Sequence, residues 1–358
     1  MQDVASLASI AGRRAGSDAE RRAARQLQQR LEAVGRDAQL EPTRVRTDFA
    51  VTNLVHAVLG VVGSVVSVYQ PALGLALAAT AMVSAFGDLT GTFHLVQSLT
   101  PVRASQNVVS AENEGKPGLI VLVAHYDSPR TGMLQAPRLA IWPRAIVISL
   151  LVVTVCGLGR LLGLDSTWFT IVQFIPTVVL IVSTPLFADA AIADTAAGDT
   201  DNAAGVAVVL SLAGEYARRL QHFDLMVVLT GASAHFGVGF RQWLRRHRHE
   251  LDNSATAVIS VDNLTAAEVR YVAKEGAVFA SRMHPTLVEL AAEAGAAAES
   301  REVSDAYVAR MAGLPAIRIT TAVPDGDGTV DGDALEAVRA YAAALLERID
   351  EAIGPSLR

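Results

Sequence analysis

The chain has 358 residues, a length that allows about two domains. Its apolar fraction of 51% and mean hydropathy of +0.34 are high for a soluble protein, whereas aromatic residues make up only 5%. A net charge of −6 excludes the basic surface that nucleic-acid binding needs, so we expect no nucleic-acid partner. A single cysteine, Cys156, excludes a disulfide framework within the chain.

The first elements along the chain are one amphipathic helix and one long apolar stretch. Ser17-Asp18-Ala19-Glu20 has the pattern of a capping box, and Gly35 is placed to end the helix that it opens. The segment Leu54 to Phe86 contains no charged residue. Pro71 divides it into two stretches of about 17 residues each, which is near the lower limit for a membrane-spanning helix.

A second pair of apolar stretches follows further on. Ala145 to Gly159 is uncharged, and the apolar run reaches Leu164 past Arg160. Trp168 to Ala188 comes next, and its two prolines predict breaks at Pro176 and Pro185. Buried core helices are one interpretation of these runs. They are, however, too apolar on every side for amphipathic surface helices, which favours two transmembrane hairpins with membrane lipid as their partner.

The distribution of arginines predicts the orientation of these hairpins. Four spans place all flanking polar segments on one side of the membrane. Arginines are concentrated in those flanks, whereas the loops on the opposite side hold only Arg160. The flanking arginines are Arg36, Arg44, Arg46, Arg103, Arg130, Arg138 and Arg144. The positive-inside rule therefore predicts a multi-pass protein of the cell membrane whose polar domain is cytoplasmic.

Strands alternate with helices in the remaining sequence, which predicts an α/β fold with a mixed, mostly parallel sheet flanked by helices. The expected strands are 107–110, 119–124, 225–229, 257–261 and 316–320, and the expected helices are 202–220, 236–248, 285–298 and 334–353. We predict an α/β domain formed by residues 1–50, 101–136 and 189–358. The first transmembrane hairpin then covers residues 51–100 and the second covers residues 137–188.

His125, Gly231 and Asp262 lie at or just beyond the expected strand ends, where α/β sheets bind ligands. His125 and Asp127 follow one strand, and a nearby carboxylate is the usual group that orients a metal-binding histidine. Asp201 opens a helix, and Asp262 ends another strand. A His-x-Asp pair is common by chance, Asp201 could be a helix N-cap, and Asp262 could form a turn. Together the positions predict a metal site.

At these motifs the chain resembles metallopeptidase family 28, the two-zinc aminopeptidases, over nearly all of its non-membrane sequence. The resemblance is carried by Val121-Leu-Val-Ala-His125-Tyr-Asp127-Ser128, by Asp199-Thr-Asp201-Asn202-Ala-Ala-Gly205, by Val258-Ile-Ser-Val-Asp262 and by the segment Ser304 to Ala316. It implies an α/β domain of the zinc-aminopeptidase type. It also implies that His125 binds one zinc, that Asp127 orients it, that Asp201 bridges both zincs and that Asp262 binds the second.

Two departures from the family pattern stand beside these matches. The resemblance implies a Glu-Glu pair after the strand Val227 to Leu229, the first as general base and the second as zinc ligand. Ser233 and Ala234 occupy those positions, and Ala306 occupies the position of the last histidine ligand. Zinc needs about four ligands, and general-base catalysis typically supplies about 10²–10⁴-fold. We therefore expect zinc to bind weakly or not at all, with His235 as a substitute ligand only in a shifted alignment.

These observations lead to competing functions. The preferred hypothesis is a membrane-anchored relative with lost or much reduced peptidase activity, which binds a peptide or partner protein or acts as a scaffold. The alternative is an active zinc-dependent aminopeptidase with a rearranged site. Acidic residues in the Gly-rich loop, namely Asp325, Asp327 and Asp331, could approach such a site but are more typical of solvated turns. A transporter is disfavoured, because the apolar runs hold no Asp, Glu or Lys.

Overall fold

The fold was obtained as a computed structural model, which describes residues 2–130, 132–133, 139, 142–195, 202–266, 268–322 and 332–352. The chain divides into two compact units. The first comprises residues 1–47, 103–129 and 195–358, and the second comprises residues 48–102 and 130–194. The chain therefore leaves the first unit twice, each time to build part of the second.

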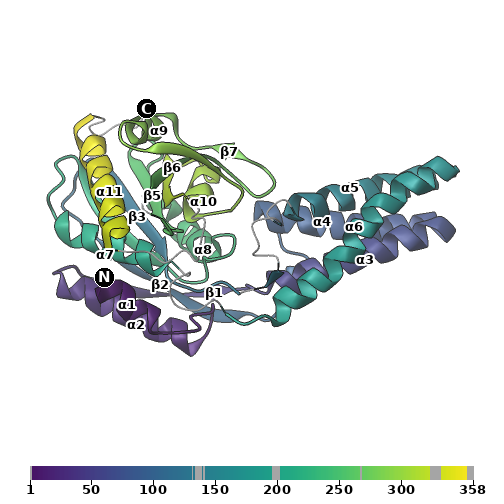
Figure 1. The fold of residues 1–358 in the computed structure, drawn as a ribbon, viewed down its shortest axis with the longest axis horizontal. Helices are drawn as coiled ribbons and strands as arrows, with labels where there is room; N and C mark the ends of the chain where they lie inside the picture. Colours follow the sequence, from purple (N-terminus) through teal and green to yellow (C-terminus); the bar gives the residue numbers. More distant parts are fainter. Residues whose placement is uncertain are drawn as a thin grey trace. The chain divides into compact units, whose positions relative to one another are not determined.

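The first unit is an α/β domain (Figure 1). Its helices are α1 (Gln2–Ala8), α2 (Asp18–Ala33), α7 (Ala203–Glu215), α8 (Val238–His247), α9 (Pro285–Ala292), α10 (Asp305–Met311) and α11 (Gly332–Ala352), with a short 3₁₀ turn at Arg248–Glu250. Its strands are β1 (Gln39–Val45), β2 (Arg103–Ala111), β3 (Gly118–His125), β4 (Phe223–Thr230), β5 (Thr256–Val261), β6 (Val269–Glu275), β7 (Ser281–Arg282), β8 (Ala296–Ser300) and β9 (Ala316–Thr321).

All strands of the described residues join one mixed sheet in the order β1-β2-β4-β3-β5-β9-β6-β7, with β8 beside β6. The central strands β4, β3, β5 and β9 are parallel to one another, whereas β1, β2 and β6 join by antiparallel pairing. The predicted α/β fold with a mixed, mostly parallel sheet is confirmed. Because the central strands are parallel, β3, β4, β5 and β9 all end at the same edge of the sheet.

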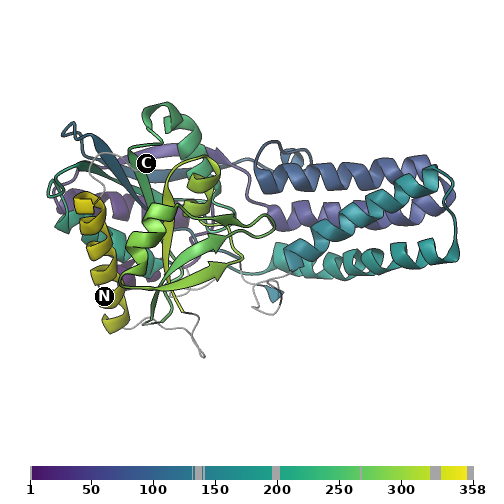
Figure 2. The same cartoon turned by 90° about the horizontal axis from the view of Figure 1, so that it is seen from above.

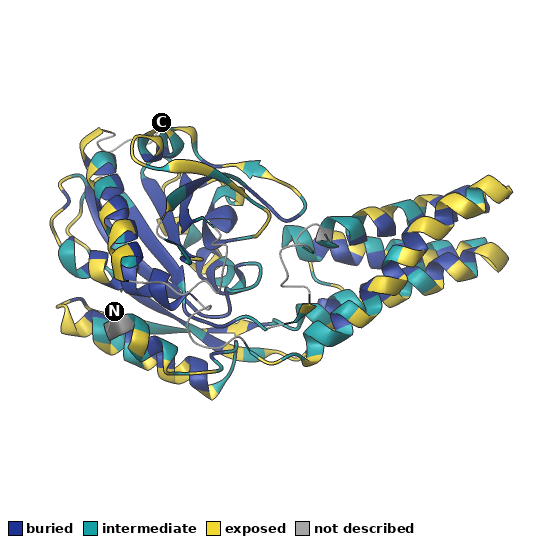
Figure 3. Ribbon diagram, viewed as in Figure 1, coloured by how far each residue is buried: buried dark blue, intermediate teal, exposed yellow. Residues whose placement is uncertain are grey.

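The sheet is covered on both faces, which explains why its central strands are almost wholly apolar (Figure 3). Alternate residues of β3 face opposite sides, so Ile120 and Leu122 join one core while Val121 and Val123 join the other. Helices α2, α7 and α11 pack on the first side, and α8 and α10 pack on the second. Burial on both faces fixes the register of the strands and thus the position of the residues at their ends.

Two predicted helices end earlier than expected. The helix predicted over 285–298 stops at Ala292, and the Ala-rich segment that follows is strand β8. Gly295 precedes this strand, and parallel pairing with β6 satisfies its main chain and outweighs the helix propensity of alanine. The helix predicted over 202–220 ends at Glu215, and Arg218 has a left-handed backbone with φ +59°.

The second unit is a bundle of long apolar helices (Figure 2). They are α3 (Phe49–Tyr69), α4 (Pro71–Thr90), α5 (Trp142–Leu161) and α6 (Thr167–Ile192), with a 3₁₀ turn at Gln97–Leu99. Pro71 occupies the first turn of α4, so the predicted division there is confirmed.

The predicted breaks in the last apolar stretch are wrong, because α6 continues through Pro176 and Pro185. A proline cannot donate to the carbonyl four residues before it. In α6 the carbonyl of Ile181, left free in this way by Pro185, accepts the hydroxyl of Thr184. Side-chain hydroxyls thus replace part of the lost hydrogen bonding, as in other proline-containing helices of apolar surroundings.

By length and composition, four helices among the described residues could cross a membrane. Gly63 lets α3 approach α4 closely, since a Cβ there would lie 2.8 Å from the backbone nitrogen of Ala78. Valines at helical spacing along α3 are exposed, and these are Val51, Val55, Val58, Val62 and Val65. The outer surface of α3 is therefore apolar, as a lipid-facing helix requires.

The bundle is not wholly free of acidic groups, in contrast to the apolar runs read from the sequence. Helix α4 extends to Thr90 and so includes Asp88, and α6 includes Asp189. The imidazole Nε2 of the buried His56 lies 2.9 Å from Ser84 Oγ and 3.8 Å from Asp88 Oδ2. These polar contacts join α3 to α4.

Candidate functional site

The predicted site residues lie along the edge of the sheet where the parallel strands end. His125 is the last residue of β3, Asp127 follows it, and Asp262 comes directly after β5, the neighbour of β3. Asp201 lies outside the described residues, as do Asp325, Asp327 and Asp331. The structure thus brings His125 and Asp262 to one edge, and the role of Asp201 stays a prediction.

Asp127 is held by the loop that follows β4. Its Oδ1 accepts hydrogen bonds from the backbone N–H groups of Ser233 and Ala234, at 2.8 and 3.0 Å. Burial raises the pKa of Asp127, although His125 and these two N–H groups oppose the shift. His125 Nδ1 lies 3.7 Å from Asp127 Oδ1 and 3.2 Å from the Asp127 carbonyl oxygen. The predicted orientation of His125 by the Asp127 carboxylate stays a prediction.

The loop after β4 brings no carboxylate to this edge. The Ser233 hydroxyl is buried and accepts a hydrogen bond from the backbone N–H of Phe240, at 3.1 Å. That contact fixes the first turn of α8 through the only side-chain oxygen of the segment 231–234. Ala234 has no side-chain donor or acceptor, and His235 is half-buried in the same loop. The proposed substitution by His235 as a ligand stays a prediction.

At the remaining degenerate position, Ala306 is fully buried and its methyl group belongs to the apolar core on the α8 side. Its neighbour Asp305 begins α10, and Asp305 Oδ2 accepts a hydrogen bond of 2.7 Å from the Thr230 hydroxyl. Burial raises the pKa of Asp305 to about 7. Ala306 therefore packs in the apolar core, and the polar group at this point of the chain is the carboxyl of Asp305.

The carboxylate of Asp262 is paired with an arginine that our sequence analysis did not select. Arg318 lies on β9 opposite Ser260 of β5, and its Nη2 is 2.5 Å from Asp262 Oδ1. The same guanidinium contacts Glu302 at 2.7 Å and Glu275 at 3.2 Å. Burial alone would lower the pKa of Arg318, but these carboxylates raise it, so the group is a permanent cation.

Glu20 is a second residue whose role was missed. Half of the predicted capping box is present: the Ser17 hydroxyl accepts the N–H of Glu20 at 3.1 Å, but the Ser17 N–H donates to the Arg14 carbonyl rather than to Glu20. The Glu20 carboxyl, however, reaches the site loop and accepts the N–H of Ala232 at 3.1 Å and the Ser105 hydroxyl at 2.7 Å. Burial, followed by the nearby Asp127, raises the pKa of Glu20 to about 8. Ala232 itself has φ +54°, a costly backbone conformation that these contacts stabilise.

The described side chains do not fit a pair of zinc ions. Within the described residues, no three or more His, Cys, Asp or Glu side chains are placed to hold a metal ion together. Each zinc needs about four ligands, including a water in a catalytic site. Here Asp262 is paired with Arg318. The family resemblance implies further zinc ligands at positions 234 and 306 and a general base at position 233, but these positions hold Ala234, Ala306 and Ser233.

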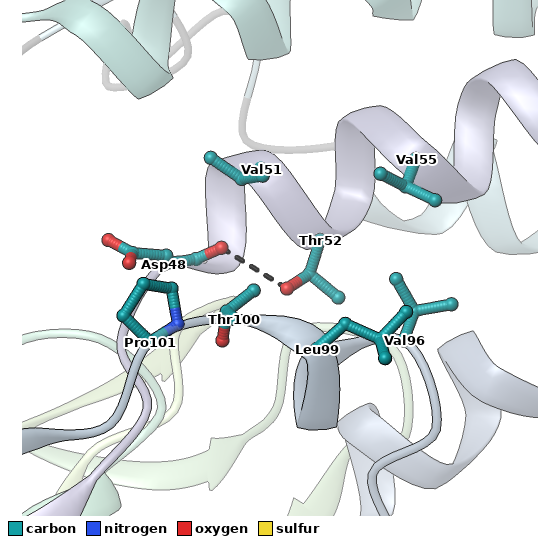
Figure 4. A pocket seen from close by; sticks show the side chains of 8 residues that line it. All are labelled: Asp48, Val51, Thr52, Val55, Val96, Leu99, Thr100 and Pro101. Atoms are coloured by element: carbon teal, nitrogen blue, oxygen red, sulfur yellow. Dashed lines mark hydrogen bonds between the residues drawn. The ribbon is translucent and has the colours of Figure 1, made fainter.

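A small apolar groove belongs to the helical unit rather than to this edge. It has a volume of about 210 Å³ and is lined by Asp48, Val51, Thr52, Val55, Val96, Leu99, Thr100 and Pro101 (Figure 4). At one end the Thr52 hydroxyl donates a hydrogen bond to the Asp48 carbonyl, at 3.1 Å. The groove contains none of the predicted site residues.

Comparisons with known proteins agree with this fold. The sequence model of peptidase family M28 matches residues 179–341. Solved structures with a similar fold include a glutaminyl cyclase from Fimbriiglobus ruber, with a TM-score of 0.55 and 12% identity over 97% of this chain and 93% of that chain. A leucine aminopeptidase precursor from Bacteroides thetaiotaomicron gives a TM-score of 0.55 and 12% identity over 96% and 94% of the two chains.

A zinc-dependent exopeptidase from Parabacteroides distasonis gives a TM-score of 0.53 and 12% identity over 98% of this chain and 96% of that chain. None of the curated protein sequences matches the chain. At these identities the structural likeness establishes the fold and not the activity. The predicted resemblance is confirmed: the chain has the fold of zinc-dependent exopeptidases and glutaminyl cyclases, and its residues 179–341 match peptidase family M28.

Proposed function

We propose that this chain is a membrane-anchored protein with a family-M28 fold whose peptidase activity is lost or much reduced. Its strand-edge site would then bind a peptide or partner protein, or the protein would act as a scaffold. The observation that carries the proposal is the loop after β4. In place of a base and a ligand it offers a Ser233 hydroxyl engaged with Phe240, and the methyl group of Ala234.

Chemistry supports this choice over an active aminopeptidase with a rearranged site. A serine hydroxyl near neutral pH is a poor base, and an alanine cannot bind zinc. Asp127 Oδ1 accepts hydrogen bonds from two backbone N–H groups, and Asp262 Oδ1 forms an ion pair with Arg318. If zinc binds at all, a single weak site that uses His125 and Asp201 is the form that these residues favour.

Membrane anchoring through hairpins 51–100 and 137–188 is the second part of the proposal. The length of the four helices and the exposed valines of α3 support it. The arginine distribution supports a cytoplasmic location of the α/β domain. We expect the protein to stay in the membrane pellet after carbonate extraction, and a protease added outside intact cells to leave the C-terminus uncut. Release by carbonate would contradict the anchoring, and loss of the C-terminus would reverse the orientation.

The activity is tested on the full-length chain, purified in detergent without chelators. We expect zinc well below one equivalent and no cleavage of aminoacyl-nitroanilides above the rate of a detergent blank. His125→Ala removes the best remaining ligand, and His249→Ala is the matched control, since His249 is an exposed histidine away from the edge. Near-stoichiometric zinc and peptidase activity that disappear in His125→Ala, but not in the control, would establish the alternative.

A further inference from the structure

Arg318 is an unusual residue for its position. It is the charged residue of the apolar strand β9, and it is only 2% exposed. Three carboxylates from three separate segments converge on its guanidinium, namely Asp262 after β5, Glu275 at the end of β6 and Glu302 before α10. The Ser300 hydroxyl adds a fourth oxygen at 3.1 Å from Nη1.

Two of these carboxylates contact the same guanidinium nitrogen, Nη2. Asp262 Oδ1 lies 2.5 Å from Nη2, and Glu302 Oε2 lies 2.7 Å from it. Calcium–oxygen distances are typically about 2.3–2.6 Å. A metal ion bound to Asp262 Oδ1 would therefore have to occupy nearly the same volume as the Nη2 group. Two cations cannot share that volume, so binding of the guanidinium excludes a metal ion there.

We propose that the Arg318 guanidinium is the resident cation of this site and holds the position at Asp262 where a second metal ion would have to bind. It keeps the three acidic side chains together without metal. The inference deepens the proposed loss of metal-dependent catalysis and rests on it. It goes further, because it gives Asp262 a role that needs no metal: Asp262 is the partner of Arg318.

If Arg318 excludes a metal ion, a variant without this arginine should gain the ability to bind one. Arg318→Gln leaves Asp262, Glu275 and Glu302 without their cation, and breaking a buried ion pair in this way is strongly destabilising. We expect the melting temperature Tm of the α/β unit to fall by roughly 10 °C. The freed carboxylates should then accept a divalent cation, so 1 mM CaCl₂ or ZnCl₂ should raise the Tm of this variant by roughly 3–5 °C.

Three comparisons identify the cause. The wild-type chain, stripped with chelator, should show no rise in Tm with CaCl₂, and any rise with ZnCl₂ should disappear in His125→Ala. The double variant Arg318→Gln/Asp262→Asn should lose most of the response, because asparagine removes the negative charge and one of the two carboxylate oxygens. Arg270→Gln is the matched control, because Arg270 lies on the neighbouring strand β6 and pairs with Glu268 at the surface. It should leave both Tm and the metal response unchanged.

Two further variants keep the test decisive should Arg318→Gln fail to fold. Arg318→Lys retains a positive charge and should fold without gaining a metal response. Asp262→Asn alone should lower Tm yet leave the zinc content of the protein unchanged. The proposal is overturned if Arg318→Gln folds and ignores both metals, or if Asp262→Asn removes zinc that the wild type holds. If the protein binds one zinc ion and has peptidase activity that depends on His125, the proposed loss of activity is wrong, but the proposed role of Arg318 is unaffected.

Discussion

Glu20 offers the sharpest test of the electrostatics at the strand edge. Its side chain is completely buried, and its two oxygens accept hydrogen bonds from Gly16, Ala232 and Ser105. Its pKa is raised from 4.5 to about 8, first by burial and then by Asp127. In the folded chain this carboxyl therefore keeps its proton over a pH range in which the unfolded chain loses it.

The sign of the effect follows from this difference. Below pH 4.5 both states are protonated, so the stabilisation associated with the neutral carboxyl is fully present. As the pH rises toward 8 the unfolded state alone ionises, and stability is lost. At about 1.4 kcal/mol per pH unit, the gap between the two pKa values corresponds to a loss of roughly 4–5 kcal/mol in the free energy of unfolding, as an upper limit.

Glu20→Gln replaces the titrating carboxyl group by an uncharged amide of nearly the same size. We expect the wild type to lose stability relative to this variant by roughly 3–5 kcal/mol between pH 5 and pH 9. The assay is urea unfolding in detergent, followed by the fluorescence of Trp243, the tryptophan of the α/β unit. Trp142 and Trp168 of the helical unit are replaced by Phe.

Glu32→Gln on the exposed face of the same helix is the control and should leave the pH profile unchanged. A constant offset between wild type and Glu20→Gln is expected, because the amide group of glutamine faces backbone donors. Parallel stability curves for the two proteins across the whole pH range would refute the assignment of a proton to Glu20.

Two further predictions concern other parts of the chain. His247 is partly buried, which lowers its pKa, but hydrogen bonds to Glu250 and Glu41 raise the pKa above 6.5 overall. Its contribution to stability is therefore present below pH 6.5 and lost as the pH rises through the folded pKa. We expect His247→Gln to reduce the stability difference between pH 6 and pH 8 by at most about 1 kcal/mol, and a histidine NMR titration that gives a pKa below 6.5 would contradict this. In the helical unit, Gln173 donates to Ser64 and accepts from the buried guanidinium of α5 at 2.7 Å. We expect Gln173→Leu to destabilise the bundle by about 1–3 kcal/mol in micelle unfolding experiments, and the exposed control Phe174→Leu to have little effect.

The fold was largely predictable because its signals are local. Strands β3, β4, β5 and β9 are short apolar runs whose pattern follows directly from burial on both faces. Parallel strands end at one edge, so the positions of His125 and Asp262 followed from the predicted topology. The helical hairpins were predictable for the same reason, since length and composition alone identify them.

The contacts of the site were not predictable, because they join segments that are distant in sequence. Glu20 was interpreted as part of a capping box, yet its carboxyl contacts residues 85 and 212 positions away. Arg318 draws its partners from three separate elements. The one local signal was a charged residue inside the apolar strand Ala316–Thr321. A buried charge requires a partner, so that position could have been selected as a candidate for an ion pair.

The double departure of the chain from the α/β domain has a consequence for biosynthesis. Residues 48–102 separate β1 from β2, its antiparallel partner, and residues 130–194 separate β3 from β4, its parallel partner. The sheet therefore cannot close until both helical segments have left the ribosome. Because these are the segments proposed to enter the bilayer, translocon delivery would precede assembly of the sheet. A chain whose hairpins fail to insert would expose unpaired strand edges, which are prone to aggregation.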